Sequence, residues 1–286
     1  MSIEFKNVNY IYNQGTPFEY QGLKDISFNL TDGNFIAIIG HTGSGKSTLL
    51  QHFDALLKPT SGEIKLAGFD ITSKTTNKNL KSLRKKVGIV FQFPENQLFA
   101  ETILKDAMFG PLNFGMDADL AEKNAKKWLK RLGIKEELYE QSPFDLSGGQ
   151  MRRVAIAGVL AYEPEILCLD EPAAGLDPVG RKEIMSIFKE YQKNGHTVIL
   201  ITHEMDDVAQ YADDVLVLQQ AKLIKHTTVA DLFENPEWLA EHYLNQPHAA
   251  RFAQTLKQNG FKLKQTPLTI EQLAKSISKK MREYNE

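Results

Sequence analysis

A glycine-rich run near the start of the chain has the residue types and the spacing that bind phosphate groups. Residues 40–47 fit the pattern G-x-x-x-x-G-K-[ST] and follow the apolar run 35–39, which reads as a buried strand. In such a loop backbone amides face the phosphates, the following helix start adds partial positive charge, and the lysine reaches the β- and γ-phosphates. We therefore expect ATP to contact Gly40, His41, Thr42, Gly43, Ser44, Gly45, Lys46, Ser47 and Thr48.

Two adjacent carboxylates follow a second apolar run, at residues 166–169. Asp170 is expected to ligate Mg²⁺ together with the hydroxyl of Ser47, as the acidic partner of a phosphate loop does. Neighbouring side chains on a strand point to opposite faces, so Glu171 is free for a different task. We expect Glu171 to be the general base that polarises the attacking water; the alternative is that it caps the turn that follows.

Two further polar residues, Gln92 and His203, each end a predicted buried strand. Ligands of parallel α/β sheets bind at the carboxyl ends of the strands, so both residues should share an edge with Asp170. Gln92 is expected to contact Mg²⁺ or the attacking water, which makes Ser47, Gln92 and Asp170 the candidate metal ligands. His203 is expected to sense the γ-phosphate, and it completes the candidate catalytic set with Glu171 and Gln92.

A second helix start with the character of an anion site lies about a hundred residues further on, in the run LSGGQMRR at 146–153. If one nucleotide fills the first site, this helix start faces no ligand in its own chain. We therefore expect it to grip the γ-phosphate bound by a second subunit, so that two ATP molecules lie between two chains arranged head to tail. ATP then favours the closed pair, and hydrolysis reopens it. The expected contacts are Ser147, Gly148, Gly149 and Gln150.

The order of predicted elements indicates an α/β fold with a P-loop NTPase core and a mainly parallel sheet. Alternating residues in the first thirty positions predict a small antiparallel β part, and helical periodicity over about 94–162 predicts an inserted helical subdomain. We place the ATPase domain at 1–235 and a small helical appendage at 236–286. The run 269–272 has the pattern of a capping box for the last helix.

Composition narrows the classes of partner. The chain has 286 residues with 34 Lys and Arg and 36 Asp and Glu, and this net charge of −2 gives no reason to expect nucleic acid as a partner. The single cysteine, Cys168, excludes an internal disulfide and fits a reducing compartment. No signal peptide and no apolar run of a membrane-spanning length is visible, so any membrane span must come from another chain.

The phosphate loop, Gln92, LSGGQ, the acidic strand end, Asp177 and His203, in this order, resemble an ABC-type ATPase. LSGGQ separates this class from other P-loop NTPases, and the resemblance covers about residues 1–235. It implies ATP hydrolysis with Mg²⁺ and an aromatic side chain stacked on adenine. Tyr12 matches that position best, with Tyr10 and Tyr20 as alternatives. It also implies that Asp177 couples the two subunits.

Finer features are similar to the ATPase subunits of energy-coupling factor transporters, the cobalt, nickel and vitamin uptake group. They are FQFPENQLF after residue 90 and the run EPAAGLDP, which matches the second of two paralogous ATPases. The resemblance implies a translocase (EC 7 class) at the cytoplasmic face of the cell membrane, in a heterodimer with a paralogous ATPase. The other implied partners are a transmembrane coupling protein, with a helix in a groove near Gln92 and 93–99, and a membrane substrate-binding protein.

Two alternatives differ in partner or in class. A conventional ABC importer with a soluble binding protein would use the appendage as a regulatory domain. A soluble ABC protein of DNA repair or translation would carry a long coiled-coil insertion or two cassettes in one chain, and neither is visible. The transported compound is contacted by another chain in this architecture, so this sequence does not identify it.

Overall fold

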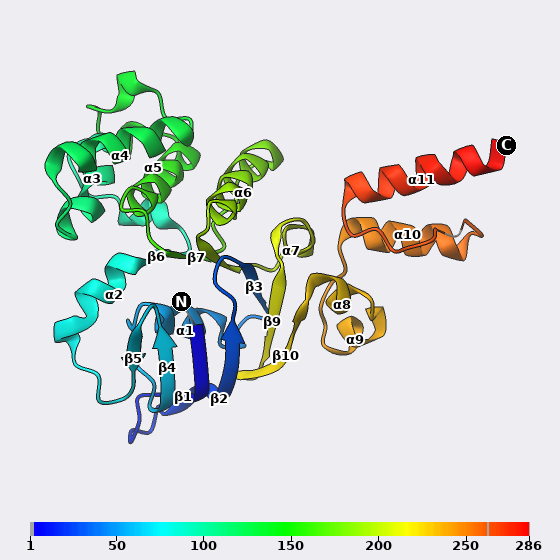
Figure 1. The fold of residues 1–286 in the computed structure, drawn as a ribbon, viewed down its shortest axis with the longest axis horizontal. Coiled ribbons are helices and arrows are strands. Elements are labelled where there is room, and N and C mark those ends of the chain that lie inside the picture. The colour runs from blue at the N-terminus through cyan, green and yellow to red at the C-terminus, as the bar shows by residue number, and fades with distance from the viewer. Residues whose placement is uncertain (1–2, 262, 286) are drawn as a thin grey trace.

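The computed structural model describes residues 3–261 and 263–285, and two sheets organise this part of the chain (Figure 1). The smaller sheet is antiparallel with the strand order β2-β1-β4-β5. Its apolar side chains point into one core because alternate residues of each strand face the same side. Its strands are β1 (Ile3–Tyr12), β2 (Tyr20–Leu30), β4 (Ser61–Leu66) and β5 (Phe69–Ile71).

The larger sheet has the strand order β10-β9-β3-β8-β7-β6, and all its pairs are parallel except β10 with β9. Every residue of β3, β7 and β8 is buried, as expected for parallel strands that are covered on both faces. The strands are β3 (Phe35–Ile39), β6 (Val87–Val90), β7 (Ile166–Asp170), β8 (Thr197–Ile201), β9 (Asp214–Gln219) and β10 (Lys222–Thr228).

A helical lobe lies between β6 and β7 in sequence, and its helix α5 contacts β6 of the larger sheet (Figure 1). Its helices pack through one apolar cluster that includes Trp128 and Val154. Asp117 begins the middle helix by accepting hydrogen bonds from the amides of Asp119 and Leu120. The lobe comprises α3 (Ile103–Asn113), α4 (Ala118–Arg131), α5 (Gly148–Leu160) and the short 3₁₀ turns η2 (Pro94–Gln97), η3 (Glu136–Leu138) and η4 (Pro143–Asp145).

The remaining helices of the α/β part connect the strands. The helix after the phosphate loop ends at Phe53, because Ala55 takes a left-handed backbone conformation (φ 53°) just beyond it. These elements are α1 (Lys46–Phe53), η1 (Asn77–Asn79), α2 (Leu80–Lys86), α6 (Pro178–Lys193) and α7 (Met205–Tyr211).

The carboxyl-terminal part is helical and is joined closely to the phosphate-loop side. Leu239 is fully buried in the same cluster as Ala37, so core packing continues across the domain boundary that we predict at residue 235. His41 Nε2 donates to the carbonyl oxygen of His242 over 3.2 Å. The helices are α8 (Val229–Phe233), α9 (Pro236–Glu241), α10 (His248–Gln258) and α11 (Ile270–Asn285).

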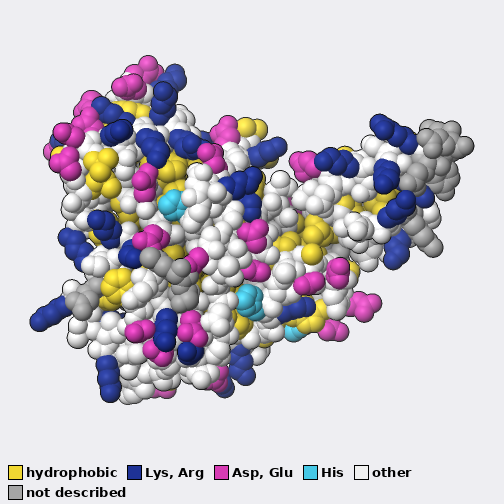
Figure 2. Space-filling view, in the orientation of Figure 1, with side chains coloured by type: hydrophobic (Ala, Val, Ile, Leu, Met, Phe, Trp, Pro, Cys, Tyr) yellow, Lys and Arg dark blue, Asp and Glu magenta, His cyan; other side chains and the backbone are white. Residues whose placement is uncertain are grey.

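The last two helices form a lobe that projects from the body (Figure 1). Figure 2 shows Lys and Arg side chains over this lobe, whereas charges of both signs mix over the body on the same face. Thr269 accepts from the amide of Gln272 over 3.2 Å, as the expected capping box requires. The Gln272 side chain reaches back to the amide of Leu268 instead of that of Thr269. No helix in the described ranges is long and apolar enough to cross a membrane.

Candidate active site

The phosphate loop is shaped by glycines in conformations that other residues rarely adopt. The φ angles of Gly40, Gly43 and Gly45 are 146°, 78° and 103°. A Cβ atom on Gly40 would lie 2.1 Å from the carbonyl oxygen of Leu218, and one on Gly45 would lie 2.8 Å from that of Gly22. A Cβ on Gly43 would meet nothing within 4 Å, so this side of the loop is open. The loop is packed on one side and free on the other, as a phosphate cradle must be.

Two side chains of this loop, Lys46 and Ser44, carry hydrogen-bond donors that suit an anion. Lys46 Nζ turns back over the loop and donates to the carbonyl oxygens of Gly40 at 2.8 Å and His41 at 2.7 Å. Burial lowers the pKa of Lys46, and the nearby carboxylates of Glu171 and Asp170 only partly oppose that effect. The hydroxyl of Ser44 is buried without a hydrogen-bond partner among the described residues. These donors fit phosphate oxygens.

Oxygen ligands for a divalent cation meet beside the lysine. Ser47 Oγ donates to Asp170 Oδ2 over 3.1 Å, and Gln92 lines the same cleft of about 350 Å³. Burial raises the pKa of Asp170, while the Ser47 hydrogen bond and the Lys46 charge oppose the rise. Within residues 3–261 and 263–285 no three His, Cys, Asp or Glu side chains converge. Ser47 and Asp170 supply oxygen atoms, the ligand type that Mg²⁺ takes from proteins beside water and substrate phosphates.

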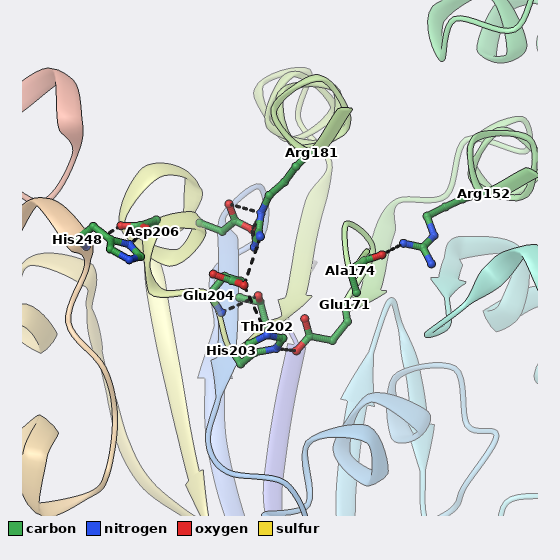
Figure 3. A network of polar contacts seen from close by, with 10 residues as sticks. Arg152, Glu171, Ala174, Arg181, Thr202, His203, Glu204, Asp206 and His248 are labelled. Carbon is green, nitrogen blue, oxygen red and sulfur yellow. Dashed lines mark hydrogen bonds and ion pairs between the residues drawn. The ribbon is translucent and has the colours of Figure 1, made fainter. Parts of the chain in front are cut away.

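The two expected catalytic side chains are in direct contact. His203 Nδ1 lies 2.7 Å from Glu171 Oε1, at the carboxyl ends of β8 and β7 (Figure 3). Glu171 has a left-handed backbone (φ 49°), and its amide donates to the carbonyl of Ile201 over 3.0 Å. Burial raises the pKa of Glu171, and His203 opposes the rise. The side chain faces His203 and the cleft, so this geometry favours a general base over a cap of the following turn.

The candidate adenine-stacking residues form one aromatic group. The Tyr12 ring is stacked on that of Tyr20 with centroids 4.6 Å apart, and its hydroxyl lies 3.1 Å from Thr48 Oγ1. Tyr10 packs edge-on against both Tyr12 and His52. Tyr20 lines the cleft and is 56% exposed. The exposed face of the group is therefore Tyr20, with Tyr12 directly behind it.

The LSGGQ run forms the capped start of α5. Ser147 Oγ accepts from the Gln150 amide over 3.4 Å, and Gln150 Oε1 accepts from the Ser147 amide over 3.1 Å, which completes a capping box. A Cβ on Gly148 would meet nothing within 4 Å, and one on Gly149 only the Leu176 side chain at 3.6 Å. None of these residues lines the nucleotide cleft, although the amides at the helix start carry partial positive charge.

Asp177 has a local task in the isolated chain. It caps α6, because its Oδ1 accepts from the amides of Val179 and Gly180, both over 2.9 Å. The Gly180 hydrogen bond is the main cause that lowers the pKa of this exposed carboxyl. The side chain remains exposed beside the same loop that carries Glu171.

Arg152 is a connecting residue that sequence patterns do not single out. Its guanidinium forms a buried ion pair with Glu95, with Nη2–Oε1 2.7 Å and Nε–Oε2 3.0 Å. It also donates to the carbonyl oxygen of Ala174 (Figure 3). Arg152 thereby joins the turn after Gln92, the LSGGQ helix and the loop after Glu171. Only the arginine itself was visible in the sequence, because its partners lie far away along the chain.

Comparison with known proteins defines the class. The model of the family described as ABC transporter matches residues 23–174. A solved structure described as a dimeric post-hydrolysis state of the ATP-binding cassette MJ0796, bound to ADP and Pi, is 32% identical with a TM-score of 0.71. The alignment covers 80% of this chain and 99% of that one. The fold and the site define an ABC-type ATPase, as the resemblance of the motifs predicts.

The relatives of this chain identify its group within that class. The energy-coupling factor transporter ATP-binding protein EcfA2 of Lactobacillus johnsonii is 60% identical, over 99% of this chain and 98% of the relative. Its counterpart in Enterococcus faecalis is 54% identical over 100% and 99%. A solved structure of cbiO1 from Clostridium perfringens, described as part of the ABC transporter complex cbiONQ, is 39% identical with a TM-score of 0.73, over 89% and 98%. The chain belongs to the family of energy-coupling factor transporter ATP-binding proteins.

Proposed function

We propose that ATP binds along the cleft between Tyr20 and Glu171 and that the chain hydrolyses it to power uptake. The observation that carries this proposal is the meeting of Lys46, Ser47, Asp170 and Glu171 on one cleft wall. The open amides of the phosphate loop would hold the β- and γ-phosphates at the helix start. The adenine would stack on the aromatic group of Tyr20 and Tyr12, at the other end of the same cleft.

The catalytic roles follow from the contacts at the γ-phosphate end. Glu171, with its raised pKa, accepts the proton of the attacking water. His203 holds the Glu171 carboxylate through Nδ1, and its other ring nitrogen, Nε2, lies 3.5 Å from Glu204 Oε1. Gln92 lies at the same edge and contacts the water or the cation. Ser47, Asp170 and Gln92 would hold Mg²⁺, which would supply positive charge against the phosphate oxygens.

The chain acts as half of a pair. The α5 start at Ser147–Gln150 is a phosphate-facing cap that is outside its own cleft, so it fits the γ-phosphate held by a second ATPase subunit. Asp177 would contact the same partner, since it is exposed beside the Glu171 loop. ATP bound at both sites closes the pair, and loss of the γ-phosphate opens it. The relatives' EcfA2 name supports a paralogous ATPase as the partner.

The pair works at the cytoplasmic face of the cell membrane with a transmembrane coupling protein and a membrane substrate-binding protein. Support comes from the transporter names of the relatives. Phe93, Phe99 and Phe109 are 48%, 61% and 51% exposed next to the turn that follows Gln92. Such a surface fits an apolar helix of the coupling protein. The cargo would be a vitamin or a metal-ion micronutrient, recognised by the substrate-binding protein.

The central test changes Glu171 to Gln in the complete transporter complex. ATP binding should persist, turnover should fall by roughly 10²–10⁴-fold, and a closed dimer should accumulate with ATP. Sedimentation and phosphate release measure these results. The matched control is Glu163→Gln, which removes the exposed Lys127–Glu163 ion pair and should leave turnover unchanged. Undiminished turnover in Glu171→Gln refutes the assignment of the base.

A second test addresses the shared site. Changing Ser147 to Arg should spare nucleotide binding by this chain but slow hydrolysis at the site in the paralogous subunit. Equal rates at both sites contradict the head-to-tail arrangement. Purification from membranes should recover a second, different ATPase with the coupling protein. Recovery of a soluble binding protein instead favours a conventional ABC importer.

A further inference from the structure

A small polar cavity lies behind the catalytic pair. It measures about 130 Å³, and its walls are the loop that follows Glu171, the start of α6 and the segment that follows β8. This volume corresponds to roughly four water molecules. Three charged side chains that the proposed catalytic roles do not use line it: Arg181, Glu204 and Asp207.

These side chains form a chain of contacts that ends on the catalytic histidine (Figure 3). Arg181 Nη1 lies 3.3 Å from Glu204 Oε1, and the same Glu204 oxygen lies 3.5 Å from His203 Nε2. The other ring nitrogen of His203 is the one that contacts Glu171 at 2.7 Å. The imidazole is therefore held between two carboxylates, and Arg181 fixes the outer one.

Arg181 has a second acid partner with a different task. Its Nε and Nη2 lie 3.1 Å and 2.8 Å from Asp207 Oδ2, and the Asp207 side chain is 12% exposed, compared with 37% for that of Glu204. The half-buried Arg181–Asp207 pair joins α6 to α7. Glu204 can therefore lose its charge while this structural pair stays in place.

The position of Arg181 on α6 connects these contacts to the turn at Asp177. The amide of Arg181 donates to the carbonyl of Asp177 over 2.9 Å, so Arg181 lies one helical turn after Asp177, the N-cap of α6. Asp177 lies on the surface proposed for contact with the second ATPase. A displacement of that turn by the partner would move Arg181, and through Glu204 the ring of His203.

We propose that Arg181 and Glu204 are positioning residues that hold the His203 ring against Glu171 and link its orientation to the partner-facing turn at Asp177. This inference rests on the roles proposed above for Glu171 and His203. A weaker hold on His203 leaves nucleotide binding intact, because neither residue lines the nucleotide cleft. It should slow hydrolysis, since small misplacements of reacting groups cost up to about a hundredfold.

The test measures ATPase kinetics in the complete transporter complex. Glu204→Gln should lower kcat by roughly tenfold to a hundredfold, with the KM for ATP and the thermal midpoint unchanged. Arg181→Lys keeps the positive charge but loses the forked guanidinium, so its kcat should lie between that of the wild type and that of Arg181→Met. The matched control is Glu190→Gln, on the same helix α6 as Arg181. It removes an exposed carboxylate from an ion pair with Arg131 of α4 and should leave kcat unchanged.

A double-mutant comparison separates this inference from the proposed catalytic roles. Glu204→Gln should add little when His203 is already changed to Ala, because Glu204 acts through that ring. If His203→Ala lowers kcat but Glu204→Gln does not, the positioning role is refuted while the catalytic roles stand. If His203→Ala leaves kcat unchanged, the proposed catalytic roles fail. Equal losses from Glu204→Gln with and without His203 also overturn the inference.

Discussion

His52 should make the stability of this protein depend on pH. Its side chain is fully buried in α1, and Nδ1 donates to the carbonyl oxygen of Thr48 over 2.7 Å, because a carbonyl can only accept. Nε2 therefore carries the lone pair and has no hydrogen-bond partner among the described residues. Burial lowers the pKa of His52 from 6.5 to about 4, against a smaller raising effect of the Thr48 hydrogen bond.

The sign of the pH effect follows from that lowered pKa. Between about pH 6.5 and pH 4 the unfolded chain binds a proton that the folded chain does not, so stability falls as the pH falls through this window. Above the window the contribution of His52 is fully present. At about pH 5 the two pKa values imply a loss of about 2 kcal/mol. Burial raises the pKa of Asp54, which makes an opposite contribution, so the raw pH slope is not the readout.

The decisive comparison is between the wild-type chain and His52→Met. Methionine fills irregular apolar space without titrating, and the Thr48 carbonyl is part of the same helix. Urea unfolding at about pH 7.5 and about pH 5 should show a loss that is smaller in the variant by about 2 kcal/mol. Equal losses in the two proteins refute the assignment of a buried, neutral imidazole.

Three further outcomes are expected. Gly45→Ala places a Cβ 2.8 Å from the Gly22 carbonyl oxygen at a φ of 103°, so a nucleotide titration should show lost ATP binding. Retained affinity would contradict the proposal that this loop binds the phosphates. Arg152→Met leaves the Glu95 carboxylate unpaired and should lower the free energy of unfolding by about 3–5 kcal/mol, and a similar cost when Glu95 is also removed argues against the pair. Tyr20→Ala should weaken ATP binding by about 1 kcal/mol in calorimetry, and unchanged affinity rules out stacking on this ring.

Local patterns predicted the parts of the fold that they encode directly. The phosphate loop, the buried strands and the cap of α5 each follow from residues that are close in sequence. Strand β10 was not predicted, because an edge strand with alternating exposure lacks a continuous apolar run. Its pairing with β9 sets the position of Ala221, whose carbonyl accepts from the Lys24 amide next to the cleft wall.

The long-range contacts of the site depend on the packing of the elements. Arg152 and Glu95 are 57 positions apart, and no periodicity marks them as partners. Tyr20 was only an alternative for adenine stacking, because its position on the cleft wall depends on how β2 folds back against β1. Arg181 and Glu204 were unremarkable charges until α6 and α7 brought them together. Site residues could be predicted from the sequence where one continuous segment supplies them. They could not be predicted where residues from several distant segments come together.

The contact between His41 and His242 ties the phosphate loop to the chain beyond α9. Tyr243, Leu244 and Asn245 share a cavity wall with Glu171 and His203, so the same stretch borders the catalytic edge. Truncated proteins are therefore unsuitable as neutral tools for enzymology. Ending the chain before Tyr243 would remove residues that line the cavity beside the proposed catalytic residues. Any change in ATPase rate would then report the altered site as well as the loss of the carboxyl-terminal helices.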